Sequence, residues 1–467
     1  MGSALHIRID RSAKTTLAEQ IRQGVIAAIS SGALGLGARL PSWITLAAQL
    51  GVSRGTVKSA YERLIDEQVI VSSRAGGTRV ASHPPVGRMV APEAAHSAPA
   101  PHQRRLAVPA IFQMGVPAPD SLPKPLLARL RAHAARMEVE APAVYPDPGG
   151  ELEFRREIAA HIALARGLAC SPSQVFITAG FAGALGLTLS VLGLEGREAW
   201  VENPGFFQSR RALEFARLVP VAVPVDDDGL DVRCGMRTSP GAALALVTPG
   251  QQAPLGGTLS LERRLELIAW AARTGAWIIE DDYLGELQLN RRAAPALASL
   301  DSGGRVIHIG SFSKTVSPAL RLGFVVVPPA LAPRFAEAAL YFGSAPGPAV
   351  QHATAQFMRE GHYMRHLRRL KRTYAARGEA LKATWERLGY RVHIGGLAAV
   401  VRLPGGVSDI DVTRSALDLG MAPSPLSSWF APGTQAESGL LLGIATVSEQ
   451  QIPGACERLH LLISTGR

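Results

Sequence analysis

The sequence predicts an α/β protein in which a small, mainly helical unit precedes a large domain built on a mostly parallel sheet. Three observations predict this organisation. Amphipathic helical patterns occupy residues 12–81, a segment rich in proline and alanine follows, and short β-branched runs then alternate with helical stretches. Strands that alternate with helices are typical of a parallel sheet covered on both faces.

Composition bounds the class of protein. The chain has 467 residues, 47% of them hydrophobic, which is enough for two or three domains with a sizeable core. Lysine and arginine exceed aspartate and glutamate by eleven, which favours a polyanion as partner. The cysteines, Cys170, Cys234 and Cys456, are too widely spaced for a metal motif or a disulfide framework. Because neither a leader pattern nor an apolar span of membrane length occurs, we expect a soluble, cytoplasmic protein with no membrane partner.

Residues 12–81 are predicted to form the first domain. A first amphipathic helix is followed by a second, which opens at Ser42. Gly51 then turns the chain, and Ser53 caps a third helix over 54–67. Two short β runs follow and predict a two-stranded wing. The domain is therefore predicted to be a winged helix-turn-helix.

Three motifs in this domain are Leu17-Ala-Glu-Gln-Ile21, Leu50-Gly-Val-Ser-Arg-Gly-Thr-Val57 and Gly76-Gly-Thr-Arg-Val80. In this order they resemble the winged helix-turn-helix of GntR-type bacterial regulators. The resemblance implies double-stranded operator DNA as partner, with the third helix in the major groove and the wing at phosphates or the minor groove. The residues expected at the DNA are Ser42, Ser53, Arg54, Thr56, Lys58, Arg74, Gly77 and Arg79.

Ile44 departs from the GntR pattern, which usually has an arginine there that contacts the DNA backbone. We expect its absence to remove roughly one phosphate contact and to lower the salt slope by about one unit, without changing base readout. The alternative interpretation of Arg54 and Lys58 is an ordinary solvated helix face.

Residues 82–108 are expected to form a linker. Five prolines occur among alanine, serine and histidine, and no apolar period is present. Such a segment is extended and semi-rigid, so it would let the first domain move relative to the large domain, 109–467. The last part of the large domain, about 352–467, is predicted to be a smaller α+β subdomain that begins with a basic helix.

The predicted sheet of the large domain is built from strand-like runs at 175–178, 200–202, 244–247, 277–279, 306–309 and 324–327. Lys314 lies on the turn between the last two runs, with Ser311, Ser313 and Arg321 beside it. This set matches what a pyridoxal phosphate Schiff base needs, because the amine bonds the aldehyde while hydroxyls and a guanidinium hold the phosphate. Taken alone, the pattern also fits a surface lysine in a serine-rich loop.

Further motifs occur in a fixed order along the large domain. They are Tyr145-x-Asp-Pro-x-Gly150, Arg166-Gly167, Thr178-Ala-Gly180, Glu202-Asn-Pro-Gly205, Thr248-Pro249, Pro254-Leu-Gly256, Glu280-Asp-Asp-Tyr283, Ser311-Phe-Ser-Lys314 and Gly361-His-Tyr-Met-Arg-His-Leu-Arg-Arg369. Together they resemble the fold-type I aminotransferase domain of MocR-type regulators, the branch of GntR-like proteins in which a winged helix is fused to an aminotransferase fold. The resemblance covers nearly the whole chain.

The resemblance implies pyridoxal 5'-phosphate as cofactor, carried on Lys314. Asp281 would pair with the pyridinium nitrogen and keep it protonated, and Tyr283 and Thr248 would approach the ring hydroxyl. Around the phosphate it implies Ser311, Ser313, Arg321, the backbone amides of Phe181 and Ala182 at a helix N-terminus, and Tyr145 from a neighbouring subunit. A residue contributed by a neighbour implies a homodimer.

Two positions suggest that the large domain does not hold a carboxylate as transaminases do. Gln208 and Leu441 stand where the resemblance would place carboxylate-binding arginines. A charge-assisted hydrogen bond of that kind contributes about 1.5 to 3 kcal/mol. Arg210 or Arg402 could substitute for them.

We therefore expect a DNA-binding transcription regulator whose large domain senses pyridoxal phosphate, an amine or an amino acid. One alternative is a working aminotransferase with a DNA-binding appendage. The absence of the two carboxylate-binding arginines argues against it, because turnover needs a substrate held with its Cα–H perpendicular to the cofactor ring. A second alternative is a regulator with a cofactor-free large domain, since Phe181 and Ala182 offer the phosphate no hydrogen-bonding side chain.

Overall fold

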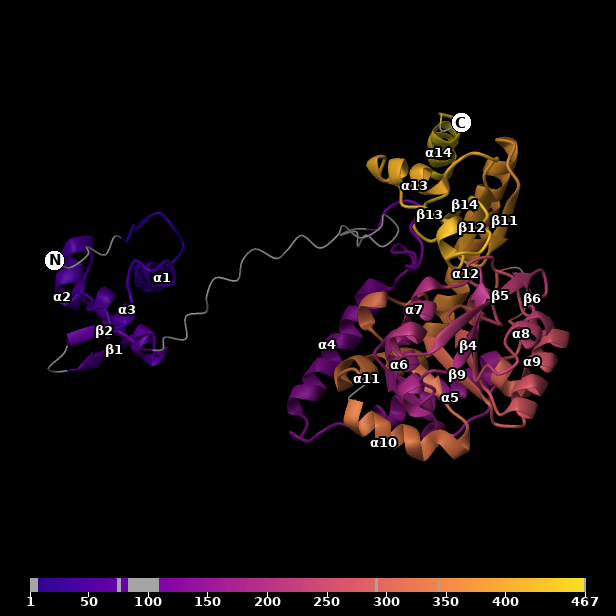
Figure 1. Cartoon of the computed structure of the whole chain (residues 1–467), viewed down its shortest axis with the longest axis horizontal. Helices are drawn as coiled ribbons and strands as arrows, with labels where there is room; N and C mark the ends of the chain where they lie inside the picture. Colours follow the sequence, from indigo (N-terminus) through magenta and orange to yellow (C-terminus); the bar gives the residue numbers. More distant parts are fainter. Residues whose placement is uncertain (1–6, 74–76, 83–108, 290–292, 343–344, 466–467) are drawn as a thin grey trace. The chain divides into compact units, whose positions relative to one another are not determined.

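The computed structural model describes residues 7–73, 77–82, 109–289, 293–342 and 345–465. The chain divides into two compact units, Met1–Ala98 and Pro99–Arg467, which are described separately (Figure 1). Arg74 and all of the expected linker except residue 82 lie outside the described residues. No helix within the described ranges is long and apolar enough to cross a membrane.

The first unit is a three-helix bundle with a two-stranded ribbon. Strands β1 and β2 pair antiparallel, with Ile70 opposite Val80, and both side chains enter the core between the helices. Ile7 packs on Gly24 of α1, so this core includes residues before position 12, the expected start of the domain. The elements are α1 (Leu17–Ser30), α2 (Trp43–Leu50), α3 (Arg54–Asp66), β1 (Ile70–Ser73) and β2 (Gly77–Val80).

Local capping explains where α2 and α3 begin. The Ser42 hydroxyl accepts a hydrogen bond from the backbone N–H of Thr45, and the Ser53 hydroxyl accepts one from Thr56, both at 3.1 Å. Between the two helices Gly51 adopts φ +64°, a left-handed conformation that costs glycine little. The helix-turn-helix predicted from these residues is confirmed.

The large unit is organised around an eight-stranded sheet in the order β3-β10-β9-β8-β7-β4-β5-β6. Strands β5, β4, β7, β8 and β9 run parallel, whereas β10 is antiparallel to both of its neighbours and β6 is antiparallel to β5. The mostly parallel sheet is therefore confirmed. The strands are β3 (Val175–Thr178), β4 (Glu198–Asn203), β5 (Val219–Asp226), β6 (Gly229–Leu230), β7 (Leu244–Val247), β8 (Trp277–Asp282), β9 (Val306–Ser311) and β10 (Gly323–Val326).

Strands β5 and β6 are absent from the sequence prediction. The prolines at 220 and 224 argue against a strand, because proline cannot donate to a sheet ladder. Here they lie in β5, which has β4 on one side and only the two-residue β6 on the other.

Helices cover both faces of this sheet. Ile279 and Ile307 pack toward α6 and α10, while the preceding residues, Ile278 and Val306, pack toward α8 and α9. This alternation follows from the two-residue period of a strand. The helices are α4 (Lys124–Glu140), α5 (Leu152–Arg166), α6 (Gly180–Leu192), α7 (Phe207–Phe215), α8 (Val232–Thr238), α9 (Leu261–Thr274), α10 (Ala332–Phe342) and α11 (Pro348–Arg359).

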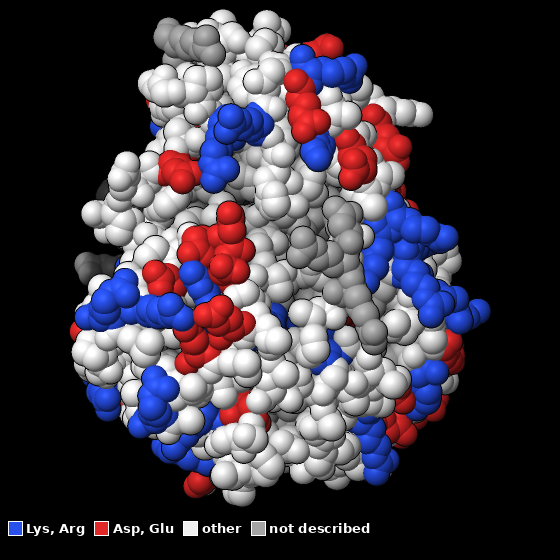
Figure 2. Space-filling view, turned by 90° about the vertical axis from the view of Figure 1, so that its right-hand side faces the viewer, with Lys and Arg blue, Asp and Glu red and all other residues white. Residues whose placement is uncertain are grey.

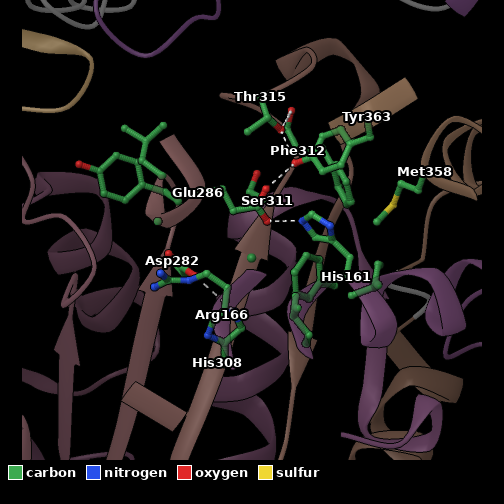
Figure 3. A pocket seen from close by; sticks show the side chains of 17 residues that line it. His161, Arg166, Asp282, Glu286, His308, Ser311, Phe312, Thr315, Met358 and Tyr363 are labelled. Carbon is green, nitrogen blue, oxygen red and sulfur yellow. Dashed lines mark hydrogen bonds and ion pairs between the residues drawn. The ribbon is translucent and has the colours of Figure 1, made fainter. Parts of the chain in front are cut away.

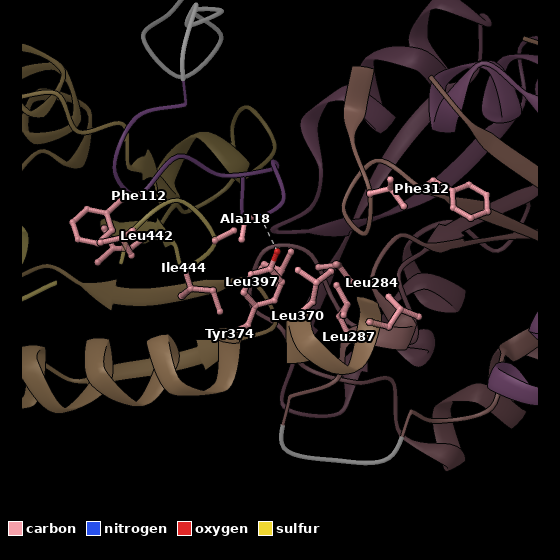
Figure 4. Packing of buried hydrophobic residues seen from close by; sticks show 14 of the residues in the cluster. Phe112, Ala118, Leu284, Leu287, Phe312, Leu370, Tyr374, Leu397, Leu442 and Ile444 are labelled. Atoms are coloured by element: carbon pink, nitrogen blue, oxygen red, sulfur yellow. Dashed lines mark hydrogen bonds between the residues drawn. The ribbon is translucent and has the colours of Figure 1, made fainter. Parts of the chain in front are cut away.

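The last part of the chain forms an antiparallel sheet in the order β11-β12-β14-β13. A segment far earlier in the sequence joins it, since Phe112 accepts a backbone hydrogen bond from Gly443 and its ring lies beside Leu442 (Figure 4). The elements are α12 (His362–Arg387), β11 (Val392–Gly395), β12 (Ala398–Arg402), α13 (Asp409–Asp418), β13 (Ser424–Pro425), β14 (Gly439–Gly443) and α14 (Ile452–Thr465).

The basic helix α12 is part of this packing. The Tyr374 hydroxyl accepts a hydrogen bond from the Ala118 N–H. The buried Arg377 donates a hydrogen bond to the Ala445 carbonyl and forms an ion pair with Asp120. On the face drawn in Figure 2, lysine and arginine alternate with aspartate and glutamate in small groups. The excess of positive charge therefore does not gather into one basic surface on that face.

Candidate functional site

A cavity of about 420 Å³ lies where the ends of β8 and β9 meet the C-terminal subdomain. Most of the residues predicted around the cofactor line it. They are Lys314, Asp281, Tyr283, Ser311, Ser313, Arg321, Phe181 and Ala182. They come from four separate stretches of sequence, so the fold assembles them.

Lys314 follows β9, and its side chain is directed into this cavity. Its Nζ donates a hydrogen bond of 2.6 Å to the carbonyl of Gly115. A Cβ on Gly115 would lie only 3.1 Å from that nitrogen, and Gly115 has φ +81°, so a side chain there is disfavoured. Burial lowers the pKa of Lys314, and the attraction of Asp281 opposes this shift only in part.

Asp281 provides the acidic group of the cavity. It is 5% exposed, and its Oδ1 has no hydrogen-bond partner among the described residues. Burial raises the pKa of Asp281 well above its ordinary range, and repulsion by Asp282 and Glu202 adds to the shift, while Lys314 opposes it. Tyr283 lies beside this carboxyl, and burial raises the pKa of its phenol as well.

Ser311, Ser313 and Arg321 form a polar end of the cavity, next to the N-terminus of α6. The Ser311 hydroxyl donates to that of Ser313 at 3.0 Å, and the Arg321 guanidinium donates to the Ala179 carbonyl at 2.9 Å. A Cβ on Gly180, which has φ +74°, would lie 3.8 Å from the guanidinium carbon. Hydroxyls, a guanidinium and a helix N-terminus are groups that bind phosphate.

Thr248 and Tyr145, both predicted at the cofactor, do not line the cavity. The Thr248 hydroxyl donates to the buried carboxylate of Glu202 at 2.5 Å and accepts from the Ala253 N–H. Its hydrogen bonds therefore hold Glu202 and Ala253 in place, and its expected contact with the ring stays a prediction. Tyr145 is fully exposed on this chain.

A buried ionic cluster lies behind the cavity and was missed as a unit by the sequence analysis (Figure 3). Arg166 Nε donates to Asp282 at 2.7 Å, and His308 Nδ1 lies 3.0 Å from Glu280. Burial alone would raise the pKa of Glu280, but attraction to His308 and two backbone N–H groups outweigh it and lower the pKa. The signal that could have found this cluster is the charged pair flanking Asp281, because alternate strand residues face opposite sides.

The two arginines that could have replaced the missing carboxylate-binding arginines do not line the cavity. Arg402 is exposed and pairs with Glu437, and Arg210 does not line the cavity. Leu441 is fully buried in an apolar cluster with Trp429. Among the described residues that line the cavity, Lys314 and Arg321 are the only cations.

In the first unit, the structure places most of the expected DNA contacts on one helix and the ribbon. Arg54 and Lys58 are exposed on α3, and Lys58 lies 3.7 Å from Glu62. Arg79 is exposed on β2 and donates to the Gly37 carbonyl. Ser42, Ser53 and Thr56 take part in the capping of α2 and α3, and Gly77 is half-buried against Arg39.

Comparison with known protein families matches nearly all of the chain. The family described as aminotransferase class I and II matches residues 120–459, and the gntR family of bacterial regulatory proteins matches residues 17–80. The probable rhizopine catabolism regulatory protein MocR of Rhizobium meliloti is 35% identical over 94% of this chain and 92% of its own length. The pyridoxine biosynthesis transcriptional regulator PdxR of Corynebacterium glutamicum is 32% identical over 99% of this chain and 98% of its own length.

Solved structures match the large unit. An archaeal alanine:glyoxylate aminotransferase covers 77% of this chain and 92% of its own, with a TM-score of 0.71 and 23% identity. The α-aminoadipate aminotransferase LysN of Thermus thermophilus covers 76% of this chain and 92% of its own, with a TM-score of 0.69 and 27% identity. The fold is that of the pyridoxal phosphate-dependent aminotransferases. The chain therefore belongs to the MocR-type regulators of the GntR family, transcriptional regulators that join a DNA-binding winged helix-turn-helix to a class I and II aminotransferase-like domain.

Proposed function

We propose that this regulator binds pyridoxal phosphate on Lys314 and that an amine, an amino acid or the cofactor itself changes its binding to operator DNA. The observation that carries the proposal is the convergence of three groups in one cavity. They are the Lys314 amine, the unpartnered Oδ1 of Asp281 and the Ser311-Ser313-Arg321 end.

The residues present fit the cofactor. Asp281 Oδ1 is a buried acceptor without a donor, and the protonated ring nitrogen would supply that donor. The Tyr283 phenol would donate to the ring hydroxyl. Arg321, Ser311 and Ser313 would bind the phosphate, with the N-terminus of α6 beside them. Hydrogen bonds from Arg321, Ser311 and Ser313 to the phosphate would compensate for the lack of polar side chains at Phe181 and Ala182.

Pyridoxal phosphate, when bound, supplies an aldehyde that combines reversibly with primary amines. Lys314 is suited to exchange with such amines, because burial lowers its pKa and thus increases the fraction of the uncharged, nucleophilic form. The Gly115 carbonyl accepts a hydrogen bond from Nζ and so gives the displaced lysine a position within the cavity. The relative PdxR, named as a regulator of pyridoxine biosynthesis, favours a signal related to the cofactor.

At the DNA, α3 would lie in the major groove with Arg54 and Lys58 near its N-terminus. A homodimer would present two such helices to two half-sites. The effector can shift DNA binding by no more than its preference for one arrangement of the protein over the other.

The cofactor proposal is tested by the visible spectrum of the full chain with added pyridoxal phosphate, before and after borohydride. We expect a long-wavelength band that borohydride fixes covalently in the parent and in Lys382→Ala, an exposed lysine variant, but not in Lys314→Ala. Equal labelling of Lys314→Ala and the parent would refute the assignment of Lys314, and no band in any of the three would refute cofactor binding.

The DNA proposal is tested with operator fragments in a gel or fluorescence assay. Arg54→Ala and Lys58→Ala are expected to weaken binding, and Arg54→Lys separates charge from geometry. A lysine keeps the phosphate attraction but loses the two-pronged hydrogen bonds of arginine, so recovery by Arg54→Lys would indicate backbone contact rather than base contact. Unchanged binding by both alanine variants would rule out α3 as the recognition helix.

A further inference from the structure

The turn that carries Lys314 is held from the side that faces away from the cofactor contacts. Lys314 lines the cavity described above, whereas the next residue, Thr315, is buried and lines the small cavity at the ionic cluster. One planar peptide unit joins the two residues. Contacts that fix Thr315 therefore also fix the main chain from which the lysine side chain extends.

Helix α12 supplies two such contacts. The Tyr363 hydroxyl donates to the Thr315 hydroxyl at 3.1 Å (Figure 3), and His366 Nε2 lies 2.7 Å from the Thr315 carbonyl. Because a carbonyl can only accept, Nε2 carries the hydrogen and His366 is the donor. Tyr363 and His366 are three positions apart and lie on one face of the helix. The side chain and the main chain of Thr315 are thus both bonded to α12.

Aromatic packing surrounds these hydrogen bonds. The ring of Tyr363 lies 5.6 Å from that of Phe312, which begins the turn, and the Phe312 carbonyl accepts from the backbone N–H groups of Val316 and Ser317. Tyr363, Phe312 and Thr315 are all buried. A hydrogen bond shielded from water is strengthened, and a polar group that loses one there finds no substitute. The turn is therefore held in one position.

The hydrogen-bond acceptor of Lys314 is connected to the same helix. The Gly115 carbonyl accepts from Nζ, and shortly after Gly115 the Ala118 N–H donates to the Tyr374 hydroxyl at 2.9 Å. Tyr374 belongs to α12, as do Tyr363 and His366. This helix therefore contacts the segments on both sides of the bond between Lys314 and Gly115.

We propose that Tyr363 and His366 are positioning residues for Lys314, which hold its turn so that Nζ meets the aldehyde of the cofactor. The inference rests on the proposed function, in which Lys314 carries pyridoxal phosphate. The Lys314 amine forms a C=N bond to the aldehyde carbon, and its two hydrogens leave with the aldehyde oxygen as water. This step requires Nζ at the aldehyde carbon, whereas binding of the phosphate and the ring does not.

The test compares pyridoxal phosphate with pyridoxamine phosphate on the full chain. The second compound has an amine in place of the aldehyde, so it occupies the same site without bonding to the lysine. We expect Tyr363→Phe to weaken formation of the borohydride-fixed band about 3- to 10-fold, the effect of one hydrogen bond. The affinity for pyridoxamine phosphate, measured by calorimetry, should not change. Tyr390→Phe is the control, because its hydroxyl bonds His460 at 3.1 Å and Tyr390 lines neither cavity.

Further variants isolate each contact. The Tyr363 hydroxyl also lies 3.4 Å from Glu286, and Thr315→Val removes only its bond to the turn. Thr315→Val should reproduce the effect of Tyr363→Phe, and the double variant should be no worse than the stronger single one. His366→Gln keeps an N–H donor and should form the band as the parent does, whereas His366→Leu should weaken it.

The possible outcomes separate this inference from the proposed function. An equal loss for both compounds would show that Tyr363 only supports the fold and would overturn the inference. A normal band in both Tyr363→Phe and His366→Leu would overturn it as well, and would leave cofactor binding on Lys314 intact. No band in the parent would instead refute cofactor binding itself.

Discussion

Three consecutive carboxylates at the end of β8 have different environments, because neighbouring residues of a strand face opposite sides. Asp281 lines the cavity and has an unpartnered Oδ1, whereas Asp282 on the other side pairs with Arg166 through Oδ2, although its own Oδ1 is also without a hydrogen-bond partner among the described residues. Glu280 pairs with His308 and accepts from two backbone N–H groups. At the scale of single residues, only Asp281 of the three lines the cavity and can contact a ligand there, whereas Glu280 and Asp282 form ion pairs inside the protein.

Asp281→Asn and Asp282→Asn are therefore expected to fail in different ways. Asp281→Asn removes the charge offered to the cofactor ring, and we expect cofactor affinity to fall about 10- to 100-fold with no loss of stability in the cofactor-free protein. Asp282→Asn leaves Arg166 buried without its counter-ion, which costs about 3–5 kcal/mol of unfolding free energy. Spectral titration and urea unfolding of both variants measure the two effects, and a destabilised Asp281→Asn would contradict the assignment.

Glu202 predicts a pH dependence of stability. Burial raises the pKa of Glu202 to about 7, although hydrogen bonds from Thr248 and Gln252 oppose the shift. Because the folded pKa lies above the unfolded value, Glu202 stabilises the fold fully at pH below about 4.5, and this contribution is lost as pH rises to about 7.

Glu202→Gln keeps a neutral side chain at every pH. Relative to the parent, the cofactor-free variant is expected to gain about 3 kcal/mol in unfolding free energy as pH is raised from 4.5 to 8. Urea unfolding at several pH values measures this difference. A difference that does not change with pH would mean that Glu202 is already ionised in the fold.

At the scale of elements, the DNA-binding helices depend on their ends. Ser53 supplies the cap of α3, and the left-handed Gly51 allows α2 to turn directly into it. Ile44 lies in the first turn of α2 and is 45% exposed, so it contributes surface rather than core. An arginine there can be introduced without loss of packing.

Ile44→Arg is expected to strengthen operator binding and to steepen its salt dependence. One added phosphate contact changes the slope of log K against log salt by about 0.9. Ile65→Arg, at the far end of α3 and 39% exposed, adds the same charge away from the predicted interface and should alter the slope less. Filter or fluorescence titrations at several salt concentrations measure both slopes, and equal slopes would place Ile44 away from the DNA.

At the scale of the whole molecule, the two units have separate cores. Among the described residues, the core of the first unit is formed within residues 21–80, with Ile7, Ile9 and Ala18 packed against it, and the described lining of the cavity around Lys314 belongs to the second unit. Units that share no core can unfold independently, and a ligand stabilises only the unit that binds it.

We therefore expect two calorimetric transitions in the full chain. Pyridoxal phosphate at about 100 times its dissociation constant should stabilise the second unit by about 2.7 kcal/mol and leave the first transition unchanged. The first transition should be reproduced by a fragment ending at residue 82. A single transition that moves as a whole with cofactor would show that the units unfold together.

The sequence by itself determined most of the elements and predicted a set of residues for the cofactor site. Helical periodicity, Ser53 and Gly51 predicted the helix-turn-helix, because caps and turns are local interactions. The β-branched runs predicted the six main strands, and motifs at their ends identified Lys314 and Asp281, which the structure brings into one cavity.

Only the tertiary structure decided which of these residues share a space. Thr248 turns to Glu202, Arg402 lies at the surface, and the Gly115 carbonyl accepts from Lys314 across a separation of 199 residues. Such contacts depend on how the sheet, its helices and the C-terminal subdomain pack, and no local pattern encodes them. The same packing leaves Asp281 Oδ1 without a partner in a cavity that segments distant in the sequence form together.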